Sequence, residues 1–262
     1  MPTVQNVIDT IIAEIPGAPF EKTVDTFKTG DPAQEVRGIV TTFLASYAVI
    51  EQAVTQDANL IITHEPTFYN HEDGIDWLAN DPVYQEKRRL INEHGIVIWR
   101  FHDYWHTHRP DGIITGVLKQ LGWQAYAQAD REYLCTLPPT TVADLAGQIK
   151  AKLASSHVRV VGDPALVCRR LALIVGAPGG RMQIEVVSKT EVDALICGEI
   201  NEWETSEYVR DAIALGRQVA LLVIGHQASE EAGMAWLVEW LPARLPDLPI
   251  VHIPTGDPFQ IL

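Results

Sequence analysis

The sequence predicts a protein of the α/β class, built as two lobes whose mainly parallel sheets are flanked by helices. Apolar runs of strand length alternate with amphipathic stretches of helix length, which is typical of parallel sheets covered by helices. Three strand-like segments also reach a histidine with a carboxylate one to four residues away, at 59–66, 95–106 and 218–231. Because open α/β sheets bind ligands at the carboxyl ends of their strands, these three ends are expected to form one site.

The first part of the chain shows the alternation most clearly. Residues 3–15 place their apolar side chains on one face, which predicts an amphipathic first helix. The elements expected after it are strand 36–43, helix 45–57, strand 59–63, a polar loop to about residue 80, helix 82–94, strand 96–101 and helix 112–121.

The middle of the chain predicts a second lobe. Its expected elements are strand 133–138, helix 141–153 with a threonine cap signal, strands 157–164 and 169–176 around a Gly-Asp-Pro turn, strand 193–199 and helix 203–215. The chain is then expected to return to the first lobe at strand 218–224 and to end near strand 250–253. The expected division is a metal-binding lobe of residues 1–126 plus 216–262 and a second α/β lobe of residues 127–215.

Composition excludes several classes of function. The net charge is −14, with 34 acidic and 20 basic side chains, which argues against a nucleic-acid binder. No apolar stretch approaches the roughly 20 residues that cross a bilayer, and the N-terminus lacks a signal-peptide pattern. The three cysteines lie far apart in apolar runs, which predicts buried free thiols. Together these features favour a cytoplasmic protein.

Histidines and acids indicate a metal site. The stretch 102–108 holds three histidines and an aspartate, and six of the nine histidines fall between positions 64 and 108. His64 and Glu65 end a strand, and His226 and Glu230 lie across a tight strand-to-helix turn whose helix is expected to begin at Glu230 with Ser229 as its cap. Such side chains hold divalent metals. The alternative is a set of structural histidines, with acids that stabilise helix starts.

Two further segments give weaker signals. Residues 176–180 are glycine-rich and follow a strand, but they lack the Lys-Ser/Thr of a phosphate loop, so a tight turn is the expected structure. The expected strand at 193–199 ends at Glu199, and Glu202 follows it. The sequence leaves open whether these acids line a site or stabilise the start of the next helix.

In this order, the segments resemble the NIF3-like family of dinuclear-metal hexameric proteins, often named GTP cyclohydrolase 1 type 2. The family pattern is a strand ending in His-His-Pro, then His-x-x-x-Asp, then Thr-Gly-Glu, then Gly-His-x-x-x-Glu. The counterparts here are His64-Glu65-Pro66, the stretch His102–His106, Cys197-Gly198-Glu199, and Gly225-His226 with Glu230. The resemblance spans nearly the whole chain, and its last motif matches residue by residue.

Two positions depart from the family pattern. Glu65 stands where the family has a second histidine, although a carboxylate can also bind a metal. His106 stands where the family places an aspartate that bridges two metals. A neutral imidazole offers one lone pair and cannot bridge. Either Asp103 takes the bridging role, or the site binds its ions differently.

The resemblance implies a metal site at strand ends in a cleft between the lobes. Its ligand candidates are His64, Glu65, His106, His226 and Glu230, with Asp103 as the alternative bridge and His102 as a ligand or as support for one. One or two divalent ions are expected, and the sequence does not distinguish Zn, Fe, Mn and Mg. The implied assembly is a homohexamer.

The function expected from this site is metal-dependent hydrolysis of a small substrate such as a nucleotide or phosphate ester. Glu199 or Glu202 is the expected proton-transfer group. The alternative function is a non-catalytic metal-binding regulator or scaffold that uses the same residues to hold its shape.

Overall fold

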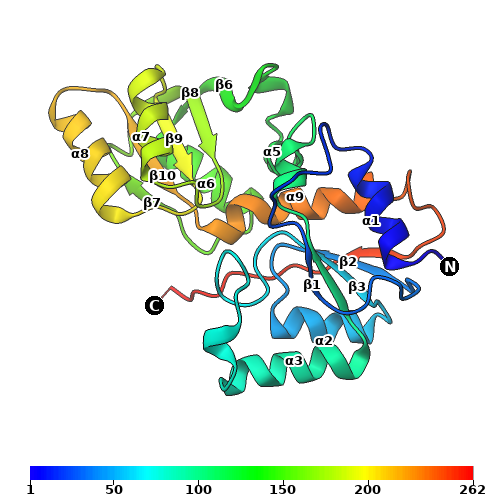
Figure 1. Ribbon diagram of the computed structural model, residues 1–262. Coiled ribbons are helices and arrows are strands. Elements are labelled where there is room, and N and C mark those ends of the chain that lie inside the picture. The colour runs from blue at the N-terminus through cyan, green and yellow to red at the C-terminus, as the bar shows by residue number, and fades with distance from the viewer. Residues whose placement is uncertain (262) are drawn as a thin grey trace. The chain divides into compact units, whose positions relative to one another are not determined.

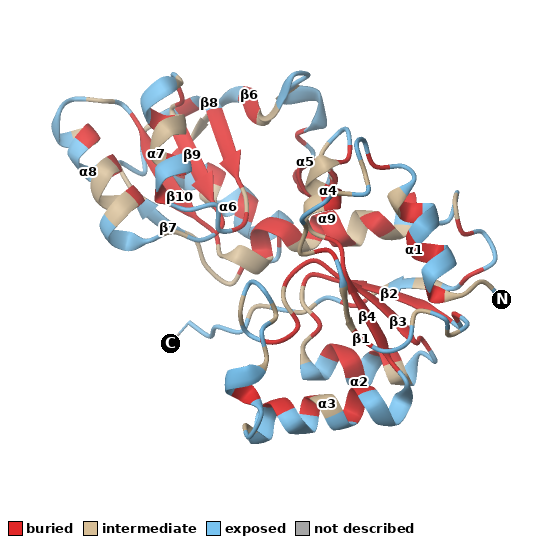
Figure 2. Ribbon diagram, in the orientation of Figure 1, coloured by how far each residue is buried: buried red, intermediate tan, exposed pale blue. Residues whose placement is uncertain are grey.

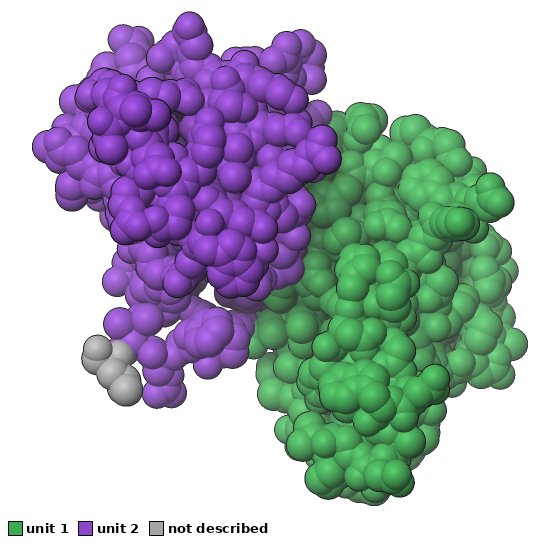
Figure 3. Space-filling model, turned by 60° about the vertical axis from the view of Figure 1, so that its left-hand side comes forward, with its two compact units in different colours: residues 1–113, 233–255 green, residues 114–232, 256–262 purple. Residues whose placement is uncertain are grey.

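The computed structural model describes residues 1–261, which form two compact units (Figure 3). Unit 1 contains residues 1–113 and 233–255, and the described part of unit 2 contains residues 114–232 and 256–261. Each unit has its own sheet with helices packed on it (Figure 1), so the predicted α/β class with two helix-flanked sheets is confirmed.

Unit 1 is built on a five-stranded sheet in the order β1-β4-β3-β2-β11. Strands β4, β3, β2 and β11 are parallel neighbours, and only β1 runs antiparallel. The elements are α1 Val4–Ile12, β1 Phe27–Thr29, β2 Ile39–Thr42, α2 Tyr47–Thr55, β3 Leu60–Thr63, η1 Asp76–Leu78, α3 Pro82–His94, β4 Val97–Arg100, α4 Asp103–Thr107 and β11 Ile250–His252. Helix α5, Gly112–Leu121, begins in this unit, and helix α9, His226–Trp240, ends in it.

Local signals explain why α3 has the bounds that the sequence predicted. The Asp81 carboxylate accepts a 2.8 Å hydrogen bond from the Tyr84 backbone N–H, and Pro82 occupies the first turn. Gly95 ends the helix with a φ of 60°, a conformation that glycine adopts without strain. The chain therefore turns directly into β4.

The two faces of the unit 1 sheet pack differently. Val40, Ile61 and Ile98 are buried with apolar side chains of α2 and α3. Figure 2 shows the strands of this sheet largely as buried. Trp99 stacks on Phe101, with ring centroids 4.9 Å apart, and belongs to an aromatic cluster that contains Trp105 and two tryptophans of α9. Successive strand residues point to opposite faces, so four-residue strands can serve both layers.

Unit 2 is built on a six-stranded sheet in the order β5-β6-β8-β9-β10-β7. Only the pairs β8/β9 and β9/β10 are parallel, so this sheet is mixed rather than mainly parallel. Apolar residues of α7 and α8 are buried in one cluster with those of the central strands. The elements are η2 Gln124–Tyr126, β5 Ala127–Gln128, β6 Arg131–Thr141, α6 Val142–Lys152, β7 Arg159–Val161, β8 Val167–Ile174, α7 Gly180–Lys189, β9 Ala194–Cys197, η3 Glu202–Ser206, α8 Glu207–Ala214 and β10 Ala220–Val223.

One strand lies in a different sheet from the one expected. The segment 218–224 was expected to return to the first lobe, but it forms β10, which pairs with β9 and β7 in the second sheet. The expectation that three histidine-bearing strand ends share one sheet is therefore wrong. A fully apolar strand suits the centre of either sheet, so its local pattern does not choose between them.

Other details follow from burial. The three cysteines are buried and free, as predicted, and burial raises the pKa of Cys135 to about 11.

Among residues 1–261, no helix has the length and apolarity needed to cross a membrane.

A matched pair of glycines gives a stability test. A methyl group at Gly112 would come within 2.1 Å of the Trp105 ring, whereas one at Gly147, within α6, would meet nothing within 4 Å. We expect Gly112→Ala to lower the free energy of unfolding by about 1–3 kcal/mol through overpacking. Gly147→Ala should raise it by up to about 1 kcal/mol, because alanine favours a helix interior. Urea unfolding of both variants measures the two effects. Equal effects would show that the Trp105 contact is not tight.

Candidate metal centre

The parallel register of β3 and β4 brings two histidines to one sheet edge. Thr63 lies opposite Arg100, the last residue of β4. The next backbone N–H, from Phe101, donates to the Thr63 carbonyl at 2.8 Å. His64 and His102 therefore leave neighbouring strands at the same edge.

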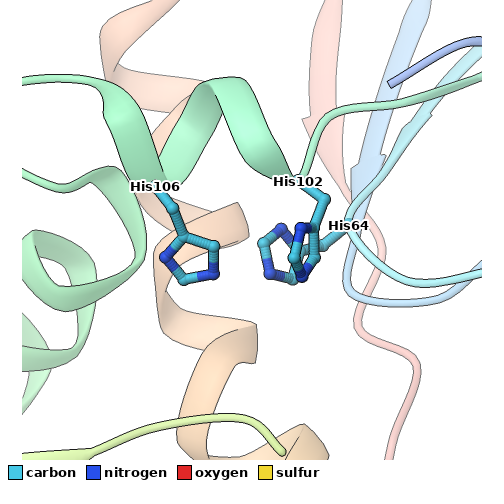
Figure 4. Close-up of side chains that lie close together, drawn as sticks. All are labelled: His64, His102 and His106. Atoms are coloured by element: carbon cyan, nitrogen blue, oxygen red, sulfur yellow. The ribbon is translucent and has the colours of Figure 1, made fainter. Parts of the chain in front are cut away.

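Helix α4 adds the third histidine. His102 immediately precedes this helix, and His106 lies one turn later, where residues four apart share a face. The rings of His64, His102 and His106 gather in one cluster (Figure 4), with centroids 4.6–5.1 Å apart. Each ring offers a nitrogen, and these three nitrogens lie within 4.8 Å of one another. That spacing allows three imidazoles to bind one ion.

Each of the three rings has its Nδ1 beside an acceptor oxygen. Nδ1 of His64 lies 3.1 Å from the Phe101 carbonyl oxygen. Nδ1 of His102 lies 2.9 Å from a carboxylate oxygen of Asp103, and Nδ1 of His106 lies 2.9 Å from one of Asp111. These oxygens can only accept, so each neutral ring carries its proton on Nδ1 and its lone pair on Nε2. Metal-binding histidines in proteins are held in the same way.

Burial keeps two of these rings neutral. It lowers the pKa of His64 well below its ordinary value, and the nearby His102 lowers it further. Burial also lowers the pKa of His102, with a second contribution from His106. A metal competes with protons for the ring nitrogen, so a lowered pKa leaves these nitrogens able to bind an ion near neutral pH.

Glu65 lies beside the cluster and faces a buried cation. One of its carboxylate oxygens is 3.8 Å from Nε2 of His102, and the other is 3.5 Å from the guanidinium of Arg100. Arg100 is fully buried and donates at 3.0 Å to the backbone carbonyl of His64. The guanidinium therefore offsets the carboxylate's charge while bracing the backbone of a histidine in the cluster.

Of the two alternatives left open by the sequence, the structure has His106 in the cluster. Asp103 instead supports His102 with one oxygen, and its other oxygen accepts from Thr23 and Val24. Burial alone would raise the pKa of Asp103, but the bonds from His102 and Thr23 hold it below its ordinary value. Asp103 thus acts on the histidine cluster through His102.

The last motif lies in unit 2, at the start of α9. Nε2 of His226 is 3.0 Å from a carboxylate oxygen of the buried Glu230, one helical turn later. Nδ1 of His226 lies 3.0 Å from Glu199. The helix begins at His226 rather than at Glu230, because Gly225 has a φ of 91° and turns the chain directly into it. The prediction that Ser229 caps this helix is therefore wrong.

Sequence reasoning missed three residues that support the cluster. Asp111 holds His106, and its proximity in sequence to the histidine-rich stretch is a signal that could have identified it. Thr23 and Asp25 contact the start of α4 from about 80 residues away, and no local pattern marks them. Burial raises the pKa of Asp25 to about 6, against the lowering effect of the backbone N–H groups of residues 102–104.

A charge-removing substitution tests Glu65. We expect Glu65→Gln to weaken divalent-metal binding by roughly 10-fold or more while the protein stays folded, because it keeps the volume and removes a nearby carboxylate. Glu72→Gln is the control, since Glu72 is an exposed acid in the same loop. Isothermal titration with Zn²⁺ measures both affinities. Equal affinities for Glu65→Gln and wild type would exclude Glu65 from the site.

The α/β sheet edge of unit 1 gathers three oriented imidazoles that could hold a metal ion. The chain matches the family model Duf34/NIF3 (NGG1p interacting factor 3) over residues 20–258. Because the match covers most of the sequence, the protein belongs to the Duf34/NIF3 family.

Individual relatives agree with this assignment. A Chlamydia muridarum protein named GTP cyclohydrolase 1 type 2 homolog is 26% identical over 240 residues, which cover 88% of this chain and 89% of its own length. An Escherichia coli K12 protein of the same name is 25% identical over 231 residues, covering 86% and 87%. The crystal structure of a Bacillus cereus protein related to NIF3 has a TM-score of 0.78 at 16% identity, covering 100% of this chain and 99% of that one. The structure of protein ybgI, described as of unknown function, also has a TM-score of 0.78, at 22% identity, and covers 98% and 100%.

Proposed function

We propose that this protein binds a divalent metal through His64, His102 and His106 and uses it to hydrolyse a small substrate such as a nucleotide or phosphate ester. The observation that carries the proposal is the convergence of three ring nitrogens within 4.8 Å, each on a ring whose Nδ1 lies beside an acceptor. A divalent ion bound there would supply Lewis acidity to an electrophilic carbon or phosphorus centre.

The chain's own residues have distinct roles in this proposal. The Phe101 carbonyl, Asp103 and Asp111 orient the three rings, so little rearrangement is needed when an ion arrives. Glu65 adds negative charge close to His102. Three imidazole ligands suit zinc, iron and other imidazole-binding metals better than magnesium.

We also propose His226 and Glu230 as metal ligands, and Glu199 as a group that orients His226 or transfers a proton. Their 3.0 Å contacts within unit 2 support these roles. Glu202 is left out of the proposal, because it is 71% exposed and ion-paired with Arg159.

The name GTP cyclohydrolase 1 type 2 homolog makes GTP the first substrate to test. Protein purified without chelator is analysed for metals and then incubated with GTP and with a panel of nucleotides and phosphate esters. Metal-dependent turnover that His64→Ala abolishes would support the proposal. Bound metal with no turnover on any substrate would favour the non-catalytic regulator or scaffold. Absence of metal under saturating Zn²⁺, Fe²⁺ and Mn²⁺ would contradict both functions.

Assembly is a separate proposal. Resemblance to the family suggests a homohexamer, and light scattering coupled to size exclusion measures the mass directly. A monomeric mass near 29.1 kDa would contradict it.

A further inference from the structure

Helix α4, which places two of the three histidines, is held at its start by a distant carboxylate. The buried Asp25 accepts hydrogen bonds from the backbone N–H groups of His102 at 2.8 Å, Asp103 at 3.1 Å and Tyr104 at 2.8 Å. A helix of five residues has little stability of its own. Its position therefore depends on contacts from outside the helix.

A second set of contacts orients the His102 ring. Thr23 Oγ1 donates to an Asp103 oxygen at 2.8 Å, and the Val24 backbone N–H donates to the same oxygen at 3.1 Å. These bonds turn the other Asp103 oxygen toward Nδ1 of His102, 2.9 Å away. Thr23 Oγ1 also accepts from the Asp25 N–H at 3.0 Å, which links the two sets of contacts.

We propose that Asp25 is a positioning residue of the metal centre, which sets through the first backbone N–H groups of α4 where His102 and His106 present their Nε2 atoms. The segment Thr23–Asp25 reaches the helix from a part of the chain that precedes the first parallel strand. This inference rests on the proposed function, because it takes a divalent ion as the group that the histidine cluster binds.

Asp25 differs from other helix caps because the helix it holds presents two of the three clustered histidines. Asp81 caps α3 through one bond to Tyr84, and α3 contributes no residue to the histidine cluster. Loss of either carboxylate should cost stability, since caps stabilise helices generally. Only the loss of Asp25 should change metal binding. Asp81→Ala is therefore the matched control.

The experiment compares Asp25→Ala, Asp25→Asn and Asp81→Ala by titration with Co²⁺, whose visible absorption bands report coordination geometry. We expect Asp25→Ala to weaken Co²⁺ binding by about 10- to 100-fold and to alter the bands. Asp25→Asn should recover part of the affinity, because its amide oxygen still accepts hydrogen bonds. Asp81→Ala should lower the melting temperature and leave affinity and bands unchanged.

Wild-type affinity and bands in a folded Asp25→Ala protein would overturn the proposal. Should Asp25→Ala fail to fold, Asp25→Asn and Thr23→Val provide the same comparison through milder losses. If the wild-type protein binds no Co²⁺, the proposed function fails, and ¹⁵N NMR of the metal-free histidine rings tests Asp25 separately. Unchanged His102 and His106 ring signals in the Asp25 variants would then overturn the positioning role, whereas shifted signals would support it.

Discussion

Replacing His64 with alanine is expected to weaken divalent-metal binding by more than about 100-fold. Losing a ligand should exceed the 10- to 100-fold effect typical of residues that only support one. His64 is the fully buried member of the cluster, and its nitrogen lies within 4.8 Å of those of His102 and His106. Two partly exposed imidazoles would remain, which is too few to hold an ion tightly. Zinc titration followed by calorimetry measures the loss.

The control for this substitution is His94→Ala. His94 is exposed at the end of α3 and belongs to no candidate metal group. The control should bind zinc as the wild type does. Because His64→Ala also removes buried volume, circular dichroism must show that the variant is folded before affinities are compared. A folded His64→Ala protein with wild-type affinity would remove the three-histidine cluster from the proposal.

The second large effect is expected from His226→Ala combined with Glu230→Ala. The two side chains are 3.0 Å apart on one turn of α9, and Glu230 is buried. Histidine nitrogens and carboxylate oxygens are both common metal ligands, so this pair is proposed to hold an ion together. We expect the double variant to lower the metal-to-protein ratio of purified protein, measured by mass spectrometry of the metals.

A neighbouring pair on the same helix serves as the control. Gln227 donates to Glu231 at 2.8 Å with the same four-residue spacing. Gln227→Ala with Glu231→Ala should leave the metal-to-protein ratio unchanged. A ratio unchanged in both double variants would show that no bound ion depends on His226 and Glu230.

Much of the fold could be predicted from sequence where local chemistry decides it. Helix α3 has the predicted bounds because Asp81, Pro82 and Gly95 each act within one turn of it. Helix α4 was not predicted, because its five residues carry no cap of their own and depend on Asp25. Strand β10 was assigned to the wrong sheet, because an apolar strand suits both.

The candidate site could likewise be predicted from the sequence only in part. By itself, the sequence determined which residue types gather at strand ends, and hence the expectation of a metal site with His64, His102 and His106 among its candidates. Only the tertiary structure decided that His106 rather than Asp103 joins the cluster, because that depends on what occupies the Asp103 oxygens. It also revealed Asp25 and Asp111, whose effect is exerted through hydrogen bonds to other residues. Hydrogen bonds between distant segments form only once the strands are in register, so no local pattern in the sequence encodes them.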